Sequence, residues 1–205
     1  PHLVLALPVN RCLELLASSE LPGDLPLPPM TSIPEARLAT VALGFTDKAD
    51  VPFGFGYLAP EQEKRFALGA LFSSHMFPGR APKGHVLLEA LVGGRRHPER
   101  LELADKELVE KVYDDLKQLI YLPEPPVFSR VLRPKWGIPQ LEEGYPSLLE
   151  WRNTLHESKD NLHLCGFGWQ GIGINDMHKQ AWIMAKRILA GYQEEQGAEV
   201  KGVYF

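Results

Sequence analysis

The segment NLHLCGFGWQGIGIND, residues 161–176, joins an apolar run to closely spaced glycines and the start of a helical pattern. Gly166, Gly168 and Gly171 spell G-x-G-x-x-G, the pattern of a dinucleotide-binding turn. Glycines let the backbone approach a ligand closely, and a helix that begins beyond them presents unpaired N–H groups to an electron-rich group. The segment therefore predicts either a ligand contact or a tight strand-to-helix connection in which glycines relieve crowding.

A complete dinucleotide-binding domain does not fit around this segment. Such a domain needs a following strand with an acidic residue about 20 positions on, but Glu194 and Glu195 lie in a polar stretch near the end of the chain. A second string of this type, GFGYLA at residues 54–59, is followed by Pro60 and by no amphipathic helix. The ligands that suit the first turn are a phosphate or the carbonyl-bearing edge of a flavin.

Side chains for acid–base or nucleophilic catalysis form no recognisable constellation. The sequence contains no G-x-S-x-G, no P-loop and no cysteine with an evident partner. Glu61, Glu89 and Asp176 are conceivable general bases, but scattered carboxylates are usually surface groups or helix caps. Without H-x-x-x-H or C-x-x-C, no metal ligand is expected. We therefore predict no catalytic side chain and assign any chemistry to a bound cofactor.

The composition is that of an ordinary globular protein. Its 205 residues are 44% hydrophobic, carry a formal net charge of -4 and are enough to bury a core. The densest basic cluster, Arg95, Arg96 and Arg100, is expected in a solvated turn, which argues against a nucleic-acid-binding stripe. Cys12 and Cys165 form no motif and favour a reducing, cytoplasmic location. No run reaches the roughly 18 to 20 apolar residues that span a bilayer.

Apolar periodicity predicts an α+β protein of unevenly alternating strands and helices, in one or two domains. The sequence begins in an apolar run without an initiator methionine, and we interpret it as part of a longer protein. Strands are predicted at residues 3–7, 38–45, 65–72, 85–92 and 127–132. Helices are predicted at residues 9–17, 105–121, 146–155 and 173–190. The buried stripes of two of these helices would be Leu108, Val112, Leu116 and Leu119, and Ile174, Met177, Ala181, Ala185 and Ile188.

Segments spread over nearly the whole chain resemble the C-terminal part of the flavin-dependent protoporphyrinogen oxidase family. In order, they are PHLVLALPVNRCLELL, the stretch from FGFGYLAP through VGGRRHP, ELVEKVYDDLKQLI, KWGIPQLEEGYPSLLEW and NLHLCGFGWQGIGINDMHKQAWIMAKRIL. The shorter motifs LFSS, FPGRAP, GIPQ and GIGIND are together specific. The resemblance implies an incomplete amine-oxidase-like fold, with a substrate-domain sheet and packed helices at residues 21–140. Residues 1–20 and 141–191 would belong to an FAD-binding domain, and residues 192–205 would form a polar tail.

The same resemblance implies contacts with FAD and with a porphyrinogen. Backbone contacts with the flavin are implied at Gly166, Phe167, Gly171, Ile172, Gly173 and Ile174. The last three would offer N–H groups at the start of the closing helix, with Asp176 as a helix-start group. Substrate contacts in the family are mainly apolar, and by position they are Leu58, Leu71 and Leu91, for which core packing is the alternative. The family's propionate-binding arginine would precede this chain, so Arg80 and Arg95 are not given that role.

The activity that the resemblance implies is stepwise dehydrogenation of protoporphyrinogen IX in haem biosynthesis, with hydride passing to the flavin and O2 being reduced to H2O2. A coproporphyrinogen III oxidase of the same family is the nearest alternative, and a carotenoid desaturase is disfavoured by FPGRAP and GIPQ. A third interpretation is an inert half that folds, dimerises or binds the missing N-terminal portion of the protein. A homodimer and peripheral attachment to the inner face of a membrane stay open for the whole enzyme.

Overall fold

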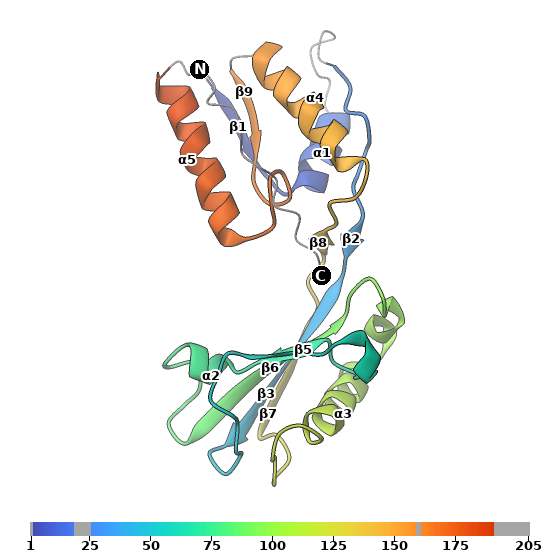
Figure 1. The fold of residues 1–205 in the computed structure, drawn as a ribbon, viewed down its shortest axis with the longest axis vertical. Coiled ribbons are helices and arrows are strands. Elements are labelled where there is room, and N and C mark those ends of the chain that lie inside the picture. Colours follow the sequence, from blue (N-terminus) through green and yellow to red (C-terminus); the bar gives the residue numbers. More distant parts are fainter. Residues whose placement is uncertain (1, 19–25, 159–160, 191–205) are drawn as a thin grey trace. The chain divides into compact units, whose positions relative to one another are not determined.

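The chain folds into two compact units (Figure 1). The computed structural model describes residues 2–18, 26–158 and 161–190. The first unit contains the described residues up to Glu35 and from Ile138 onwards, and the second unit is Ala36–Gly137. The short strands β2 (Glu35–Ala36) and β8 (Ile138–Pro139) pair with each other where the chain leaves one unit for the other. The functional domain bounds predicted at residues 20, 140 and 191 stay predictions, and the predicted tail lies outside the described residues.

The second unit is built on a five-stranded antiparallel sheet in the order β4-β5-β6-β3-β7. Its strands are β3 (Leu38–Thr46), β4 (Gly56–Leu58), β5 (Gly69–Leu71), β6 (His85–Gly93) and β7 (Phe128–Leu132). Alternation along the strands sends one set of apolar side chains to a single face, which helix α3 (Asp105–Leu116) covers (Figure 1). The core between them includes Val41, Leu43, Phe45, Leu88, Val92, Leu108, Val112 and Leu116.

Two predictions for this unit are wrong at the ends of elements. Only residues 69–71 of the strand predicted at 65–72 pair in the sheet, because the Asp115 carboxylate accepts hydrogen bonds from the N–H groups of Phe66 and Ala67. Helix α3 ends at Leu116, and Leu119 is 51% exposed instead of joining the buried stripe. The chain tightens there through a bond from the Leu119 N–H to the Leu116 carbonyl. The unit also contains the short helices η1 (Glu61–Glu63), α2 (Ser73–Met76) and η2 (Pro98–Glu102).

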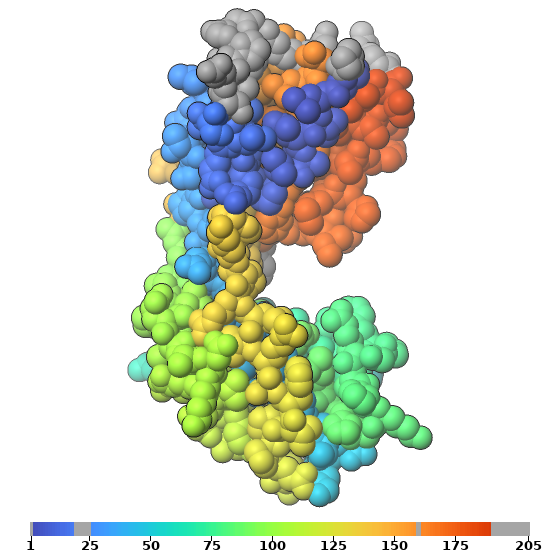
Figure 2. Space-filling view, turned by 180° about the vertical axis from the view of Figure 1, so that it is seen from behind, coloured from blue at the N-terminus to red at the C-terminus, as the bar shows by residue number. Residues whose placement is uncertain are grey.

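Arg133, just beyond β7, fastens this strand to the start of α3. Its guanidinium donates to Oδ1 of Asp105 at 2.7 and 2.9 Å and to the carbonyls of Leu101 and Leu103. Strand β7 and helix α3 accordingly form adjoining parts of the surface of this unit (Figure 2). Because these donors are engaged within the protein, Arg133 has a structural role.

The first unit places a parallel strand pair between helices. Strand β1 (Leu3–Ala6) pairs with β9 (Leu162–Cys165). Helix α5 (Ile174–Ala190) lies on one side of this pair, and α1 (Val9–Ser18) and α4 (Tyr145–Ser158) lie on the other (Figure 1). One side of α1 is buried, as its apolar spacing predicts. The core of this unit includes Val9, Cys12, Leu13, Leu16, Tyr145, Leu148, Leu155, Leu164 and Trp169.

Helix α5 buries a different line of side chains from the one predicted. Ile174, Ala181 and Ala185 are exposed, so the predicted buried stripe is wrong at these positions. The helix is instead buried at Gln180 and Met184. Its contact with β9 is made along this line, which apolar spacing alone does not predict.

Candidate functional site

The glycines in the turn between β9 and α5 adopt positive φ angles that other residues rarely adopt. These angles are +119° at Gly166, +84° at Gly168 and +124° at Gly171. A Cβ atom at Gly166 would lie 2.8 Å from the Leu7 carbonyl oxygen, and one at Gly168 would lie 2.8 Å from Cγ of Pro139. These two glycines relieve crowding inside the first unit, so packing accounts for the fingerprint-like spacing.

The fully buried side chain of Trp169 anchors this turn in the core. The Trp169 N–H donates to the Gly166 carbonyl at 3.2 Å, and the Phe167 carbonyl accepts the Val9 N–H at 2.9 Å. Gly166 and Phe167 are therefore held by hydrogen bonds within the unit, and their contact with a flavin stays a prediction. Trp169 is not among the residues predicted from the sequence, although a large aromatic residue between closely spaced glycines is an available signal.

The N–H groups at the start of α5 differ in whether they are already paired. The Gly173 N–H donates to Oδ2 of Asp176 at 3.0 Å, which confirms Asp176 as a helix-start group. The N–H groups of Ile172 and Ile174 have no hydrogen-bond partner among the described residues. The Ile174 side chain is 70% exposed. Two unpaired N–H groups at the positive end of a 17-residue helix suit an electron-rich ligand edge.

Burial makes the thiols of the first unit poor nucleophiles. It raises the pKa of Cys12 to about 12, with a further contribution from Cys165. Burial also raises the pKa of Cys165. Because the thiolate is the reactive form of cysteine, neither side chain is a catalytic nucleophile at neutral pH.

Leu58, Leu71 and Leu91 project from the same face of the five-stranded sheet. In the strand register, Gly69 on β5 lies opposite both Leu58 on β4 and Leu91 on β6, and Leu71 follows Gly69 by two residues. Successive side chains of a strand alternate between faces, so all three leucine side chains project from the sheet face that α3 does not cover. Leu58 is 72% exposed and Leu71 is 39% exposed. We call this surface the leucine face. Composition alone would place these leucines in the core, but they lie outside it.

The leucine face also carries charged side chains. Glu89 on β6 lies opposite Leu71 on β5 and opposite Ala42 on β3. Arg130 on β7 lies opposite Ala42 from the other side. The Ser73 hydroxyl donates to the Glu89 carboxylate. The Arg130 side chain is exposed and has no hydrogen-bond or ion-pair partner among residues 2–18, 26–158 and 161–190.

An apolar cavity of about 570 Å³ opens beside the edge strand β4. Its lining includes Phe53, Leu58, Phe72 and Leu119, together with Tyr57. Burial raises the pKa of Tyr57 to about 12, so the phenol is neutral at physiological pH. Leu58 thus borders both this cavity and the leucine face, which extends the apolar surface around the edge of the sheet.

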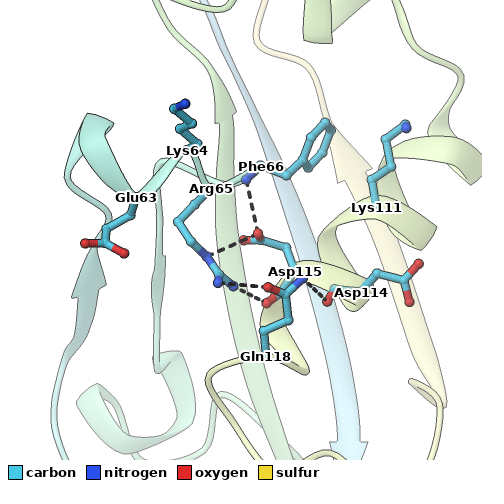
Figure 3. Close-up of a pocket in the computed structure, with 8 residues that line it drawn as sticks. All are labelled: Glu63, Lys64, Arg65, Phe66, Lys111, Asp114, Asp115 and Gln118. Carbon is cyan, nitrogen blue, oxygen red and sulfur yellow. Dashed lines mark hydrogen bonds and ion pairs between the residues drawn. The ribbon is translucent and has the colours of Figure 1, made fainter.

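A second cavity, of about 340 Å³, is polar and lies between α3 and the loop before β5. Figure 3 shows Arg65 pointing toward Asp115 and Gln118 on α3, whereas Lys64 points away from them. Nε of Arg65 lies 3.2 Å from Oδ1 of Asp115, and Nη1 lies 3.2 Å from Oε1 of Gln118. Because the charges neutralise each other and the Asp115 carboxylate also holds the loop, this cavity has a structural explanation.

The other side chains considered for catalysis or ligand binding make ordinary surface contacts. A hydrogen bond from His97 lowers the pKa of Glu61, which also pairs with Arg96 at 3.4 Å. The guanidinium of Arg80 lies over the Phe77 ring at 5.2 Å from its centre. Within the described part of the chain, no group of three or more His, Cys, Asp or Glu side chains is placed to hold a metal ion. No described helix is long and apolar enough to cross a membrane.

Comparisons with known proteins match most of the chain. A family model described as flavin containing amine oxidoreductase matches residues 2–189. The chloroplastic protoporphyrinogen oxidase of Nicotiana tabacum is 40% identical over 140 residues, which are 66% of this chain and 25% of that protein. A coproporphyrinogen III oxidase of Bacillus subtilis is 28% identical over 162 residues, 77% of this chain and 34% of that protein.

A solved structure of reduced UDP-galactopyranose mutase superposes with a TM-score of 0.73 at 17% identity, covering 94% of this chain and 42% of that one. This likeness concerns the fold alone; together with the family match it confirms the predicted amine-oxidase-like α+β architecture. The chain spans about a quarter to a third of the length of the curated relatives named above. Activity, substrate and cofactor of the whole protein therefore have to be inferred from the sites that this part contributes.

Proposed function

The chain belongs to the family of flavin containing amine oxidoreductases, and from this premise we propose that it is part of an FAD-dependent enzyme that oxidises protoporphyrinogen IX to protoporphyrin IX. Similarity to the tobacco protoporphyrinogen oxidase supports this substrate. The observation that carries the proposal is the leucine face, where strand register gathers Leu58, Leu71 and Leu91 on one surface. Exposed leucines on a sheet suit an apolar macrocycle.

The start of α5 fits the carbonyl edge of a flavin better than it fits a phosphate. The N–H groups of Ile172 and Ile174 can donate to flavin carbonyl oxygens. The nearby Asp176 carboxylate, which accepts from Gly173, offsets the positive helix end and disfavours a fully charged anion. When bound, the flavin supplies the chemistry of hydride acceptance and reoxidation by O2. The role of these residues is to hold the flavin edge rigidly, because Trp169 anchors the turn in the core.

The leucine face has the chemistry to orient a tetrapyrrole as well as to bind it. Leu58, Leu71 and Leu91 would pack against the pyrrole rings and exclude water from them. Arg130, on the same face and without an ion-pair partner among the described residues, would bind a propionate at the rim of the macrocycle. A guanidinium can hold a carboxylate through two parallel hydrogen bonds, which would fix the rotation of the substrate on the sheet.

Coproporphyrinogen III is the second candidate substrate, because a coproporphyrinogen III oxidase is also among the relatives. It carries more propionates than protoporphyrinogen IX and would need further cations beyond Arg130. The decisive experiment assays the full-length protein with both porphyrinogens and follows porphyrin fluorescence. We expect the higher kcat/KM with protoporphyrinogen IX. A strong preference for coproporphyrinogen III would replace the first proposal, and turnover of neither compound would refute both.

A non-catalytic chain is the alternative of another class. Under the proposal, the 205 residues hold only one edge of the flavin and bind free FAD weakly. Titration of this chain with FAD, followed by flavin fluorescence, tests that statement. Tight stoichiometric binding by the chain alone would show that it holds the cofactor without further protein.

A further inference from the structure

Glu89 is a carboxylate set among leucines on the leucine face. Leu71 lies directly opposite it on the neighbouring strand. Leu87 and Leu91 lie two residues before and after it on β6, and therefore point to the same side of the sheet. Glu89 itself is half-buried. The small side chain of Ala42 is its neighbour on the fourth side.

No cation neutralises this carboxylate among the described residues. Its hydrogen-bond partner is the hydroxyl of Ser73, which donates one hydrogen bond. Arg130 lies two strands away, a distance of about 10 Å at the usual spacing of strands. An ionised carboxylate offers about four lone-pair sites, so Glu89 keeps acceptor capacity toward a ligand on the leucine face.

We propose that Glu89 accepts a hydrogen bond from a pyrrole N–H of the porphyrinogen, an inference that rests on the proposed function. Each pyrrole ring of a porphyrinogen carries an N–H, and these donors converge on the centre of the macrocycle. A macrocycle that covers Leu71 and Leu91 brings its centre near the side chain between them, which is Glu89. The apolar surroundings strengthen such a bond to a charged acceptor.

The same carboxylate distinguishes the substrate from the product. In a porphyrin, half of the ring nitrogens have lost their hydrogen and present lone pairs, which repel the lone pairs of a carboxylate. Glu89 therefore favours the reduced macrocycle over the oxidised one and promotes release of the porphyrin. An unfavourable contact of this kind is an ordinary source of specificity.

The test replaces Glu89 with glutamine in the full-length protein. Glu89→Gln keeps the size of the side chain and its ability to accept from Ser73, but it adds N–H donors that pair with porphyrin nitrogens. We expect KM for protoporphyrinogen IX to rise about tenfold and Kd for protoporphyrin IX, measured by fluorescence quenching, to fall. Glu110→Gln, an exposed glutamate on α3, is the matched control and leaves both constants unchanged.

The outcomes separate this inference from the function on which it rests. An active Glu89→Gln protein with wild-type KM and wild-type affinity for the porphyrin overturns the role of Glu89 and leaves the proposed function standing. Failure of the wild-type protein to oxidise either porphyrinogen overturns the proposed function itself. If Glu89→Gln does not fold, Glu89→Asp keeps the charge, and its affinity for the porphyrin is expected to stay weak. Tight porphyrin binding by Glu89→Asp also contradicts the inference.

Discussion

Nε of Arg65, on the loop before β5, lies 3.2 Å from Oδ1 of Asp115 on α3, and both side chains are largely buried. The Asp115 carboxylate also accepts from the N–H groups of Phe66 and Ala67. Asp115→Ala would leave the buried Arg65 guanidinium without its counter-ion and two backbone N–H groups without an acceptor, so we expect the free energy of unfolding to fall by about 3 to 5 kcal/mol. Urea unfolding measures this loss. Asp114→Ala, at a 68% exposed side chain, should change it by less than about 0.5 kcal/mol.

Equal losses in the two aspartate variants would show that the pair is not a structural link. The loop it holds leads directly into β5, which carries Leu71. Asp115→Ala is therefore also expected to weaken porphyrin binding, whereas Asp114→Ala should leave porphyrin binding unchanged.

Gly166 tests the tight turn between β9 and α5. Gly166→Ala combines a positive φ with a Cβ atom 2.8 Å from the Leu7 carbonyl oxygen, so we expect a loss of about 3 kcal/mol in thermal or urea unfolding. Gly79 is the matched control, because its φ is +86° and nothing lies within 4 Å of an added Cβ. Gly79→Ala should cost about 1 kcal/mol, the strain of the backbone alone. A Gly166→Ala protein no less stable than Gly79→Ala would contradict the packed arrangement of the turn.

The leucines that share one sheet face should contribute to substrate binding and little to stability. Leu58→Ala and Leu71→Ala each remove exposed apolar surface, and we expect KM for protoporphyrinogen IX to rise about fivefold. Leu189→Ala, at an 86% exposed leucine on α5, is the control and should leave KM within a factor of two. A large loss of stability without a change in KM would show that these leucines serve packing and do not bind the substrate.

Arg130 should matter only for substrates with free carboxylates. Arg130→Gln removes the cation, and we expect about a tenfold rise in KM for protoporphyrinogen IX. The dimethyl ester of the substrate lacks the carboxylates, so the variant and the wild-type protein should oxidise it equally well. An equal effect of Arg130→Gln on the free acid and the ester would rule out a propionate contact.

His156 makes the stability of the first unit depend on pH. Its Nε2 accepts the Leu164 N–H at 2.8 Å, and burial, with Arg152, Arg187 and His163 nearby, lowers the pKa to about 3. Because the unfolded side chain binds its proton near pH 6.5, stability is full above that pH. It falls toward pH 3 by at most about 1.4 kcal/mol per pH unit.

His156→Gln keeps an acceptor for Leu164 but has no proton to bind in this range. We expect its unfolding free energy to depend less on pH between about 3 and 6.5 than that of the wild-type protein. His178→Gln, at an exposed position of α5, serves as the control. Identical pH profiles of wild type and His156→Gln would remove His156 as the cause.

Local periodicity predicts the strands and helices that bury one side, because burial on one side produces a regular spacing of apolar residues in the sequence. The alternation in β3 and β6 and the spacing of Leu108, Val112 and Leu116 in α3 are of this kind. Strand β4 is not predicted, because it is short, includes a glycine and forms by pairing with β5, a segment distant in the sequence. The loop at residues 65–68 was missed because the group that holds it, Asp115, is distant in the sequence.

The candidate site was predictable only through resemblance to a family. Apolar composition places leucines in a core, and nothing local shows that Leu58, Leu71 and Leu91 share an exposed face. From the sequence alone Glu89 is expected to be an ordinary surface carboxylate, because its leucine neighbour Leu71 lies on another strand. The engagement of the Gly173 N–H by Asp176 likewise depends on the rotation of one side chain at the helix start.

Anaerobic mixing of the FAD-loaded full-length protein with protoporphyrinogen IX tests the central claim most directly. We expect the visible absorption of the flavin to bleach on mixing and to return when O2 is admitted, with porphyrin fluorescence appearing over successive cycles. A flavin that stays oxidised in the presence of both protoporphyrinogen IX and coproporphyrinogen III would contradict it.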